Sequence, residues 1–138
     1  MIKTGETALD KLIANMEPIL NEGDYVFATV TDIDAIPRSV TIAEVKEKEG
    51  VTVILPKEEA EKLEISFEYI AAWITLNIHS SLEAVGLTAA FATELGQHNI
   101  SCNVVAAYYH DHIFVDKKDG KKAMQVLENM SISRKKKV

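Results

Sequence analysis

The segment from His79 to Gly86 contains polar residues that could bind a ligand. Ser80 and Glu83 have the spacing of a capping box, in which a serine and a glutamate satisfy the free N–H groups at the start of a helix. A helix N-terminus carries partial positive charge and is a ready site for a carboxylate or another anion. The segment therefore either caps its own helix or contacts a ligand. Glu83 could repel an anionic ligand or accept the ammonium of an amino acid.

Three histidines suggest a metal site as an alternative. His110 and His112 are two residues apart, so they would share one face of a strand, and His79 and Asp111 could join them. However, polar residues are also expected at a hairpin tip, and no second Cys/His cluster has metal-ligand spacing. We therefore interpret this stretch as a structural turn and predict no metal. A small metal-binding protein using His79, His110 and His112 stays a third hypothesis.

The single cysteine, Cys102, is the remaining candidate nucleophile. It alternates with Ile100 and Val104, which places it on the apolar side of a strand and predicts a buried, unreactive thiol. The sequence contains no phosphate-binding glycine loop and no recognisable Ser/His/Asp arrangement. We therefore expect no catalytic residue and no cofactor.

The elements that position these residues follow from hydrophobic periodicity. The second half of the chain predicts strand stretches with a phase change over 67–78, then a helix from Ser80 to Leu95. A strand over 100–109, a turn at His110–Asp111, a return strand over 112–115 and a helix over 121–130 follow. This is most of a ferredoxin-like βαββαβ unit without an obvious fourth strand. The missing strand would leave an open sheet edge.

The first half of the chain predicts a similar unit in altered form. A helix over 6–16 precedes a strand over 25–30, a hairpin over 40–55 and a short helix over 57–63. The crossover helix after the first strand is missing or replaced. We expect an α+β fold of two ferredoxin-like units in tandem, over residues 1–66 and 67–138. Packed side by side, they could share one antiparallel sheet with helices on one face.

The composition argues against nucleic-acid binding and against a membrane-spanning protein. The chain has 138 residues, of which 47% are hydrophobic and 26% charged, and its formal net charge is −6. An acidic protein is unsuited to binding nucleic acid, which needs clustered cations. No run of 18 apolar residues predicts a membrane-spanning helix, and the N-terminus has no apolar leader. With one cysteine, a cytoplasmic location is the simplest expectation.

Two stretches of this sequence resemble a known family. The run HSSLEAVGLTAAFATELGQHNISCNVVAAYYHDHIFV, over 79–115, resembles the ACT domain, and EPILNEGDYVFATV, over 17–30, resembles the first unit of small bacterial proteins with two such domains in tandem. The same domain occurs in aspartate kinases and cellular amino-acid sensors. The resemblance implies a non-enzymatic regulatory protein that binds an amino acid or a similar metabolite between ACT units. A ligand-free dimerisation module is the alternative.

The resemblance also implies where a ligand would lie. In the family, the ligand contacts the loop after the first strand, the start of the first helix and the second strand of a partner unit. Carried over, these are His79, Ser80, Ser81, Leu82, Glu83, Ala84, Val85, Gly86, Cys102, Asn103 and Val104. We further expect a homodimer, joined through sheet edges or the alanine-rich helix over 82–95, and an unidentified protein partner is conceivable.

Overall fold

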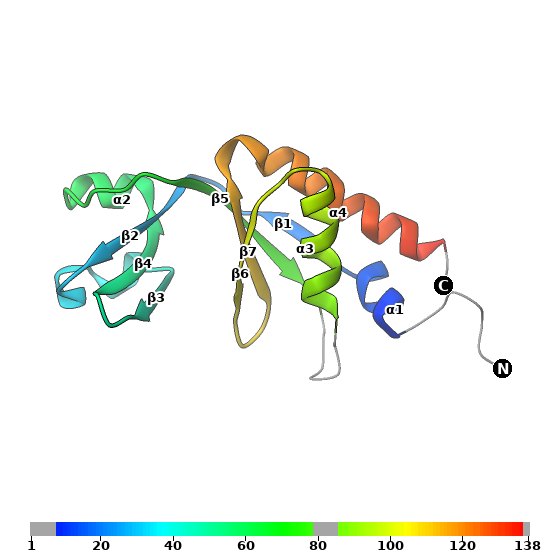
Figure 1. Ribbon diagram of the computed structural model, residues 1–138, viewed down its shortest axis with the longest axis horizontal. Coiled ribbons are helices and arrows are strands. Elements are labelled where there is room, and N and C mark those ends of the chain that lie inside the picture. The colour runs from blue at the N-terminus through cyan, green and yellow to red at the C-terminus, as the bar shows by residue number, and fades with distance from the viewer. Residues whose placement is uncertain (1–7, 79–85, 137–138) are drawn as a thin grey trace.

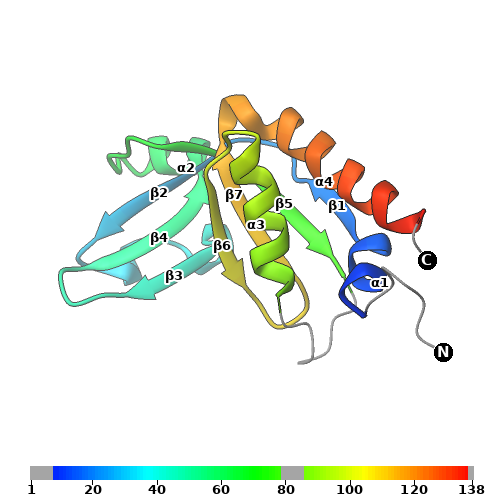
Figure 2. The same ribbon diagram turned by 45° about the vertical axis from the view of Figure 1, so that its right-hand side comes forward.

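A computed structural model describes residues 8–78 and 86–136 of the chain (Figure 1, Figure 2). In chain order, its strands are β1 (Glu17–Leu20), β2 (Tyr25–Val30), β3 (Ala43–Lys46), β4 (Val51–Pro56), β5 (Ile70–Asn77), β6 (Cys102–Ala106) and β7 (Asp111–Asp116). The helices are α1 (Ala8–Ala14), α2 (Lys57–Lys62), α3 (Leu87–Gln97) and α4 (Gly120–Lys135). Three 3-10 turns complete the list: η1 (Ile33–Ala35), η2 (Arg38–Val40) and η3 (Lys117–Asp119).

All seven strands belong to one curled sheet. The main order is β3-β4-β2-β5-β7-β6, and β1 also pairs with β5. Every strand pair within the described residues is antiparallel. The single antiparallel sheet expected from the sequence is therefore confirmed.

Strand β5 is shared by the two halves of the molecule. Ile70 and Ala71 pair with β2, and residues 74–77 pair with β1 further along the same edge, while residues 71–76 pair with β7 on the other edge. The two strand stretches predicted over 67–78 are therefore wrong. The phase change in the sequence arises because Ala71 and Ala72 are both buried, on opposite faces of a strand that is covered on both sides at this point.

Strand β1 occupies the sheet edge that the sequence predicted to be open. Its register with β5 runs from Glu17 opposite Asn77 to Leu20 opposite Ile74. The second half thus has the strand order β1-β5-β7-β6, and the N-terminal segment supplies the fourth strand that seemed to be missing. In Figure 1, the blue α1 and β1 accordingly lie beside the orange-to-red α4. The prediction that this half lacks a fourth strand is wrong.

The first half contains β3, β4, β2 and the start of β5. Strand β2 covers the predicted residues 25–30. Where a crossover helix would follow it, the chain forms the two short turns η1 and η2, and the Asp32 carboxylate caps η1 by accepting a hydrogen bond from the amide of Asp34. This confirms that the helix is replaced.

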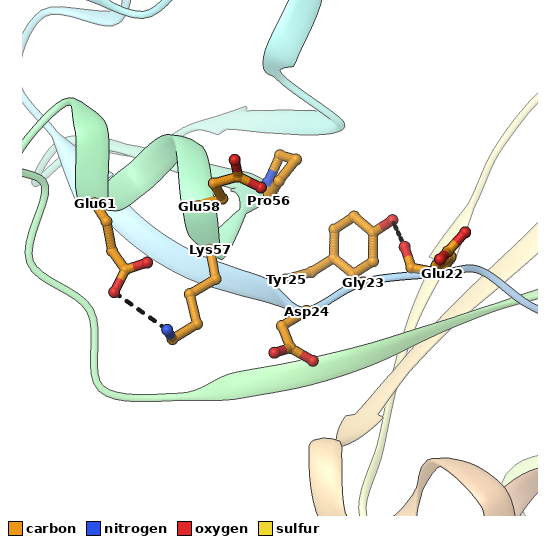
Figure 3. A pocket seen from close by; sticks show the side chains of 8 residues that line it. All are labelled: Glu22, Gly23, Asp24, Tyr25, Pro56, Lys57, Glu58 and Glu61. Carbon is orange, nitrogen blue, oxygen red and sulfur yellow. Dashed lines mark hydrogen bonds and ion pairs between the residues drawn. The ribbon is translucent and has the colours of Figure 1, made fainter.

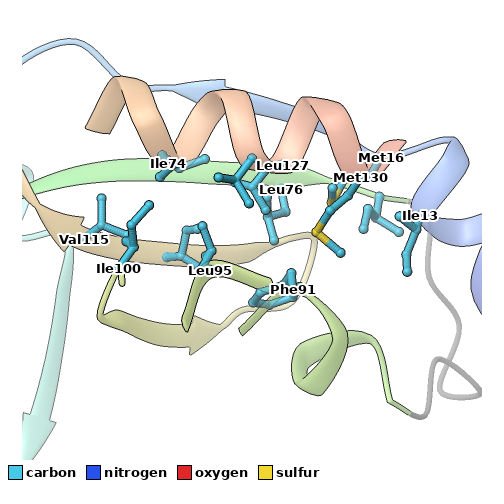
Figure 4. Close-up of a cluster of buried hydrophobic side chains, with 14 of the residues drawn as sticks. Ile13, Met16, Ile74, Leu76, Phe91, Leu95, Ile100, Val115, Leu127 and Met130 are labelled. Atoms are coloured by element: carbon cyan, nitrogen blue, oxygen red, sulfur yellow. The ribbon is translucent and has the colours of Figure 1, made fainter. Parts of the chain in front are cut away.

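The helices cover one face of the sheet. In the second half, α1, α3 and α4 bury a hydrophobic cluster against β5 and β7 (Figure 4), which includes Ile13, Ile74, Leu76, Phe91, Leu95, Val115, Leu127 and Met130. In the first half, α2 and the 3-10 turns bury Val26, Ala28, Ile36, Val53, Leu55 and Ala60. Val26 pairs with Ile70, which shares a side of β5 with Ala72 and Ile74, so both clusters lie on the same face. The predicted placement of the helices is confirmed.

The opposite face is covered where the sheet curls over itself. Phe27 of β2 meets Phe114 of β7 with ring centroids 5.4 Å apart, and Tyr25 meets Trp73 of β5 at 5.1 Å, both edge to face. Phe114 is 1% exposed. Edge-to-face aromatic pairs are stabilising beyond the area that they bury. These rings therefore form a second, aromatic core that joins the two halves of the molecule.

Two predicted boundaries differ from the structure. Gly86 has φ +87°, in the left-handed region, so α3 starts at Leu87 and a helix continuous from Ser80 to Leu95 is wrong. The capping box of Ser80 and Glu83 lies outside the described residues. The hairpin between β6 and β7 turns at 107–110, where the amide of Ala107 bonds the carbonyl of His110, rather than at His110–Asp111.

Candidate functional site

Most of the predicted ligand-binding segment lies outside the described residues. This applies to His79, Ser80, Ser81, Leu82, Glu83, Ala84 and Val85. Gly86 is described and directly precedes α3, where its left-handed backbone favours glycine over any residue with a side chain. Its carbonyl accepts the first hydrogen bond of the helix, from the amide of Ala90 at 2.8 Å.

The predicted strand residues lie on two different faces of β6. Cys102 and Val104 are half-buried against the helix-covered core, while Asn103 is on the exposed, helix-free side. Burial raises the pKa of the Cys102 thiol to about 11, so the thiol stays protonated at neutral pH. Asn103 lies near the Tyr69 hydroxyl, where it opposes the larger effect of burial, which raises the pKa of that phenol.

Two of the described site residues lie at opposite ends of α3. Gly86 precedes the start of α3, and Cys102 follows its end, so the helix of 11 residues separates them by about 16 Å. Ligand contact by these residues stays a prediction.

A hollow that the sequence did not predict lies between the β1–β2 connection and the start of α2 (Figure 3). We call it the β1–β2 hollow; it measures about 570 Å³ and is lined by Glu22, Gly23, Asp24, Tyr25, Pro56, Lys57, Glu58 and Glu61. The amide of Lys57 donates to the carbonyl of Asp24 at 2.9 Å, and the Tyr25 hydroxyl donates to the carbonyl of Glu22 at 2.6 Å. The first bond fixes the two walls relative to each other, and the second lies within the wall formed by the β1–β2 connection.

The charge of the β1–β2 hollow is negative. Its lining contains four carboxylates and one ammonium group, that of Lys57, which pairs with Glu61 at 3.2 Å. Two lysines outside the lining reduce the negative charge: Lys117 pairs with Asp24 at 2.8 Å, and Lys62 lies 3.6 Å from Glu58. The pKa of Tyr25 is raised by burial and then by the charges of Glu22 and Asp24. A positively charged group would therefore be attracted to this hollow and an anion repelled.

A second hollow lies at the junction of the two halves. It measures about 500 Å³ and is lined by Glu68, Tyr69, Ile70, Asp116, Lys117 and Lys118; we call it the junction hollow. Lys117 Nζ lies 2.8 Å from Asp24 Oδ2, so one ion pair joins the walls of both hollows. Asp24 and Lys117 are 93 positions apart in the chain, and no local pattern could have indicated that they meet.

His112 has hydrogen-bond partners of a structural kind rather than a metal geometry. His112 Nδ1 accepts a 3.0 Å hydrogen bond from Trp73 Nε1 and lies 3.1 Å from Thr75 Oγ1. Across 8–78 and 86–136, no three His, Cys, Asp or Glu side chains are grouped so that they could hold a metal ion. His79 lies outside those ranges, and the metal hypothesis gains no support from the others.

Two ACT domain models match the chain, over residues 4–72 and 68–129. The chain belongs to the ACT domain family. The two matches overlap at 68–72, where β5 leaves the first ACT unit and enters the second. None of the curated proteins compared with the chain matches it.

Solved structures with similar folds include one close relative of this ACT protein. A Vibrio cholerae protein of unknown function, described as a possible transport protein, is 46% identical with a TM-score of 0.82, covering 90% of this chain and 96% of that one. The regulatory subunit of aspartate kinase from Thermus thermophilus, in its ligand-free form, has a TM-score of 0.64 at 8% identity, covering 83% and 97%. At that identity, the similarity shows the fold.

A third structure contains a bound amino acid. Escherichia coli aspartokinase III in complex with aspartate and ADP has a TM-score of 0.57 at 12% identity, with 83% of this ACT chain and 32% of that chain covered. This chain therefore has the tandem fold of aspartate kinase regulatory ACT domains. No helix within its described residues is long and apolar enough to cross a membrane.

Proposed function

We propose that this ACT protein is a non-catalytic regulator that binds an amino acid or a similar small metabolite at an interface between ACT units. The observation that carries the proposal is the pair of ACT units in one sheet, in the fold of aspartate kinase regulatory subunits. The protonated thiol of Cys102 argues against this cysteine acting as a nucleophile, because the thiolate is the nucleophilic form.

The mechanism would be linkage between ligand binding and the arrangement of the units. A ligand that binds one arrangement more tightly shifts the population toward it. The Asp24–Lys117 ion pair lies where such a change would act, because it joins the two units and borders both hollows. A ligand ammonium in the β1–β2 hollow would compete with Lys117 for Asp24.

A thermal-shift screen of the twenty amino acids tests the ligand. A ligand that binds only the folded state stabilises it by about 2.7 kcal/mol at a hundredfold excess over Kd, which raises the melting temperature of a chain of this size by about 5–10 °C. A selective hit supports the regulator. If none of the twenty amino acids raises the melting temperature, the alternative is favoured, an ACT module that serves dimerisation alone.

Variants of the predicted contact residues locate the site. We expect Ser81→Ala or Asn103→Ala to remove the shift produced by a hit. Asn129→Ala is the matched control for Asn103→Ala, because Asn129 is exposed on α4 and lines neither hollow. A hit that survives Ser81→Ala and Asn103→Ala but is lost in Asp24→Asn moves the ligand to the β1–β2 hollow.

We also propose that the protein is a homodimer joined through the outer edge of β6. This edge strand, CNVVA, contains no charge and no proline, whereas β3 contains Glu44 and Lys46 and β1 contains Pro18. Charges and proline are what protect edge strands from pairing. Light scattering at tens of micromolar should give a dimer, and Asn103→Lys with Ala106→Lys a monomer, whereas Val45→Lys on β3 should not dissociate it.

A further inference from the structure

Four residues form a hydrogen-bonded chain across the helix-free face of the sheet. The side-chain amide of Asn21 donates to Thr75 Oγ1 at 2.9 Å, and Thr75 Oγ1 lies 3.1 Å from His112 Nδ1. Trp73 Nε1 donates to the same histidine nitrogen at 3.0 Å. The backbone and side-chain amides of Asn21 also reach the Trp73 carbonyl, at 2.9 and 3.2 Å. This His112 chain connects β7 and β5 to the segment between β1 and β2, where the second unit passes into the first.

Donor and acceptor chemistry fixes the role of His112 toward Trp73. An indole N–H only donates, so His112 Nδ1 must accept, and the neutral ring carries its proton on Nε2. Thr75 Oγ1 accepts from Asn21, and its hydroxyl proton can only share the single lone pair of Nδ1 with the Trp73 N–H. A neutral imidazole therefore accepts the hydrogen bond of Trp73, and an imidazolium, which is protonated on Nδ1, cannot.

We propose that His112 is a proton-operated latch on the junction of the two ACT units. A proton on Nδ1 leaves the N–H groups of His112 and Trp73 facing each other. Thr75 can reverse its role and accept from the imidazolium, but Trp73 has no acceptor and must turn away. This inference goes beyond the proposed function, because it requires no ligand.

The consequences of opening the latch reach the first unit. Trp73 contacts the ring of Tyr25 edge to face at 5.1 Å, and its carbonyl holds Asn21. Tyr25 lines the β1–β2 hollow. Turning Trp73 therefore releases one wall of that hollow and loosens the link between the units.

The surroundings of His112 favour the closed latch at neutral pH. Burial lowers the pKa of His112 below its usual 6.5, the charge of His110 lowers it further, and Asp111 acts in the opposite direction. His110 and Asp111 belong to the same hairpin. The residues that face the ring from β5, β6 and the segment between β1 and β2 are Trp73, Thr75, Val105 and Asn21, which do not titrate. The ring is therefore neutral at pH 7, and mild acid opens the latch.

The test uses Trp73, which is the only tryptophan in the sequence. On acidification, we expect a one-proton loss of its selectively excited emission with a midpoint below pH 6.5, because an imidazolium quenches a neighbouring indole. His112→Asn keeps an acceptor near the position of Nδ1 without titrating, and its emission should stay constant. His110→Asn is the control: it should keep the transition and raise its midpoint.

Amide exchange distinguishes an opening latch from a titration without structural effect. The Asn21 amide should exchange faster below the midpoint in the original protein but not in His112→Asn, while β5–β7 ladder amides stay protected and circular dichroism is unchanged. Constant emission from pH 7.5 to 5, a transition that persists in His112→Asn, or an Asn21 amide protected on both sides of the midpoint would each overturn the proposal.

Discussion

The two ACT units differ most in the layer that covers their shared sheet. In the second unit, α3 and α4 are joined by α1, which arrives from the other end of the chain, and together they bury a large core. In the first unit, the same face is covered by a six-residue helix, α2, and two 3-10 turns. The first unit is thus a thinner version of the second.

The difference teaches that the first unit depends on its neighbour. A unit of this size with one short helix buries too little apolar surface to be stable alone. It gains its fourth strand from the start of β5, and Phe27 and Tyr25 pack on rings of the second unit. We infer that the two units unfold together and that the first deforms more easily.

Two matched truncations, one in each core, test whether the units unfold together. They have the largest expected effect on the free energy of unfolding. Leu127 and Leu55 are both 0% exposed, in the cores of the second and first unit. Each Leu→Ala change should cost about 2–5 kcal/mol of unfolding free energy. If the units unfold together, urea curves followed by circular dichroism and by Trp73 emission will coincide in both variants.

A biphasic curve for Leu55→Ala, with the first unit melting before the second, would contradict joint unfolding. The exposed position Val45 provides the control, because Val45→Ala removes little buried surface. The loss of unfolding free energy can also be compared between the two variants, because a core that can collapse around the cavity is destabilised less. We expect Leu55→Ala to lose less unfolding free energy than Leu127→Ala.

The attachment of α1 to the second unit gives the next largest effect. Ser131 Oγ donates a buried 2.8 Å hydrogen bond to the carbonyl of Ala14, across 117 positions. Ser131→Ala leaves that carbonyl unpaired and should cost about 1–3 kcal/mol in urea unfolding. Ser133→Ala, at an exposed position of the same helix, should change little. Equal effects of the two variants would mean that α1 is not held by this bond.

Sequence patterns predicted the elements whose signal is local. Strand β2 was predicted at its observed residues because its run of β-branched and aromatic residues needs no partner to be recognised. Strand β1 was missed, because EPIL is short and contains Pro18, and it is a strand through its pairing with β5. The phase of β5 was misinterpreted because Ala71 faces a core made by a distant part of the chain.

The candidate site, too, could be predicted only where its sequence signal is local. Gly86 could be singled out from sequence, and its left-handed backbone explains why a glycine stands there. The hollows could not be predicted, because their shared ion pair joins Asp24 and Lys117 across 93 positions. The His112 chain was likewise not predictable, since the expected return strand began at His112 but no local pattern indicated that this histidine meets Trp73.

Acid should act on the junction through His112. Its folded-state pKa lies below the usual 6.5, so the unfolded chain binds this proton more readily than the folded one. Stability is therefore fully present above about pH 6.5 and is lost as the pH falls toward the folded-state pKa. Urea unfolding at pH 7.5 and 5.5 should show a decrease that His112→Asn reduces. An identical decrease in His112→Asn would assign the effect to other groups.

The smallest expected effect is that of the Asp24–Lys117 ion pair, although it joins the two units. Its side chains are 34% and 57% exposed, so solvent screens it, and a double-mutant cycle with Asp24→Asn and Lys117→Met should give about 0–1 kcal/mol, less at high salt. Lys57–Glu61, which lies within α2, is the reference pair. A weak pair is what a regulator needs at this position, because a ligand can shift the units only by its differential affinity for their arrangements. A coupling well above 1 kcal/mol would instead make the junction a fixed support and place any switching elsewhere.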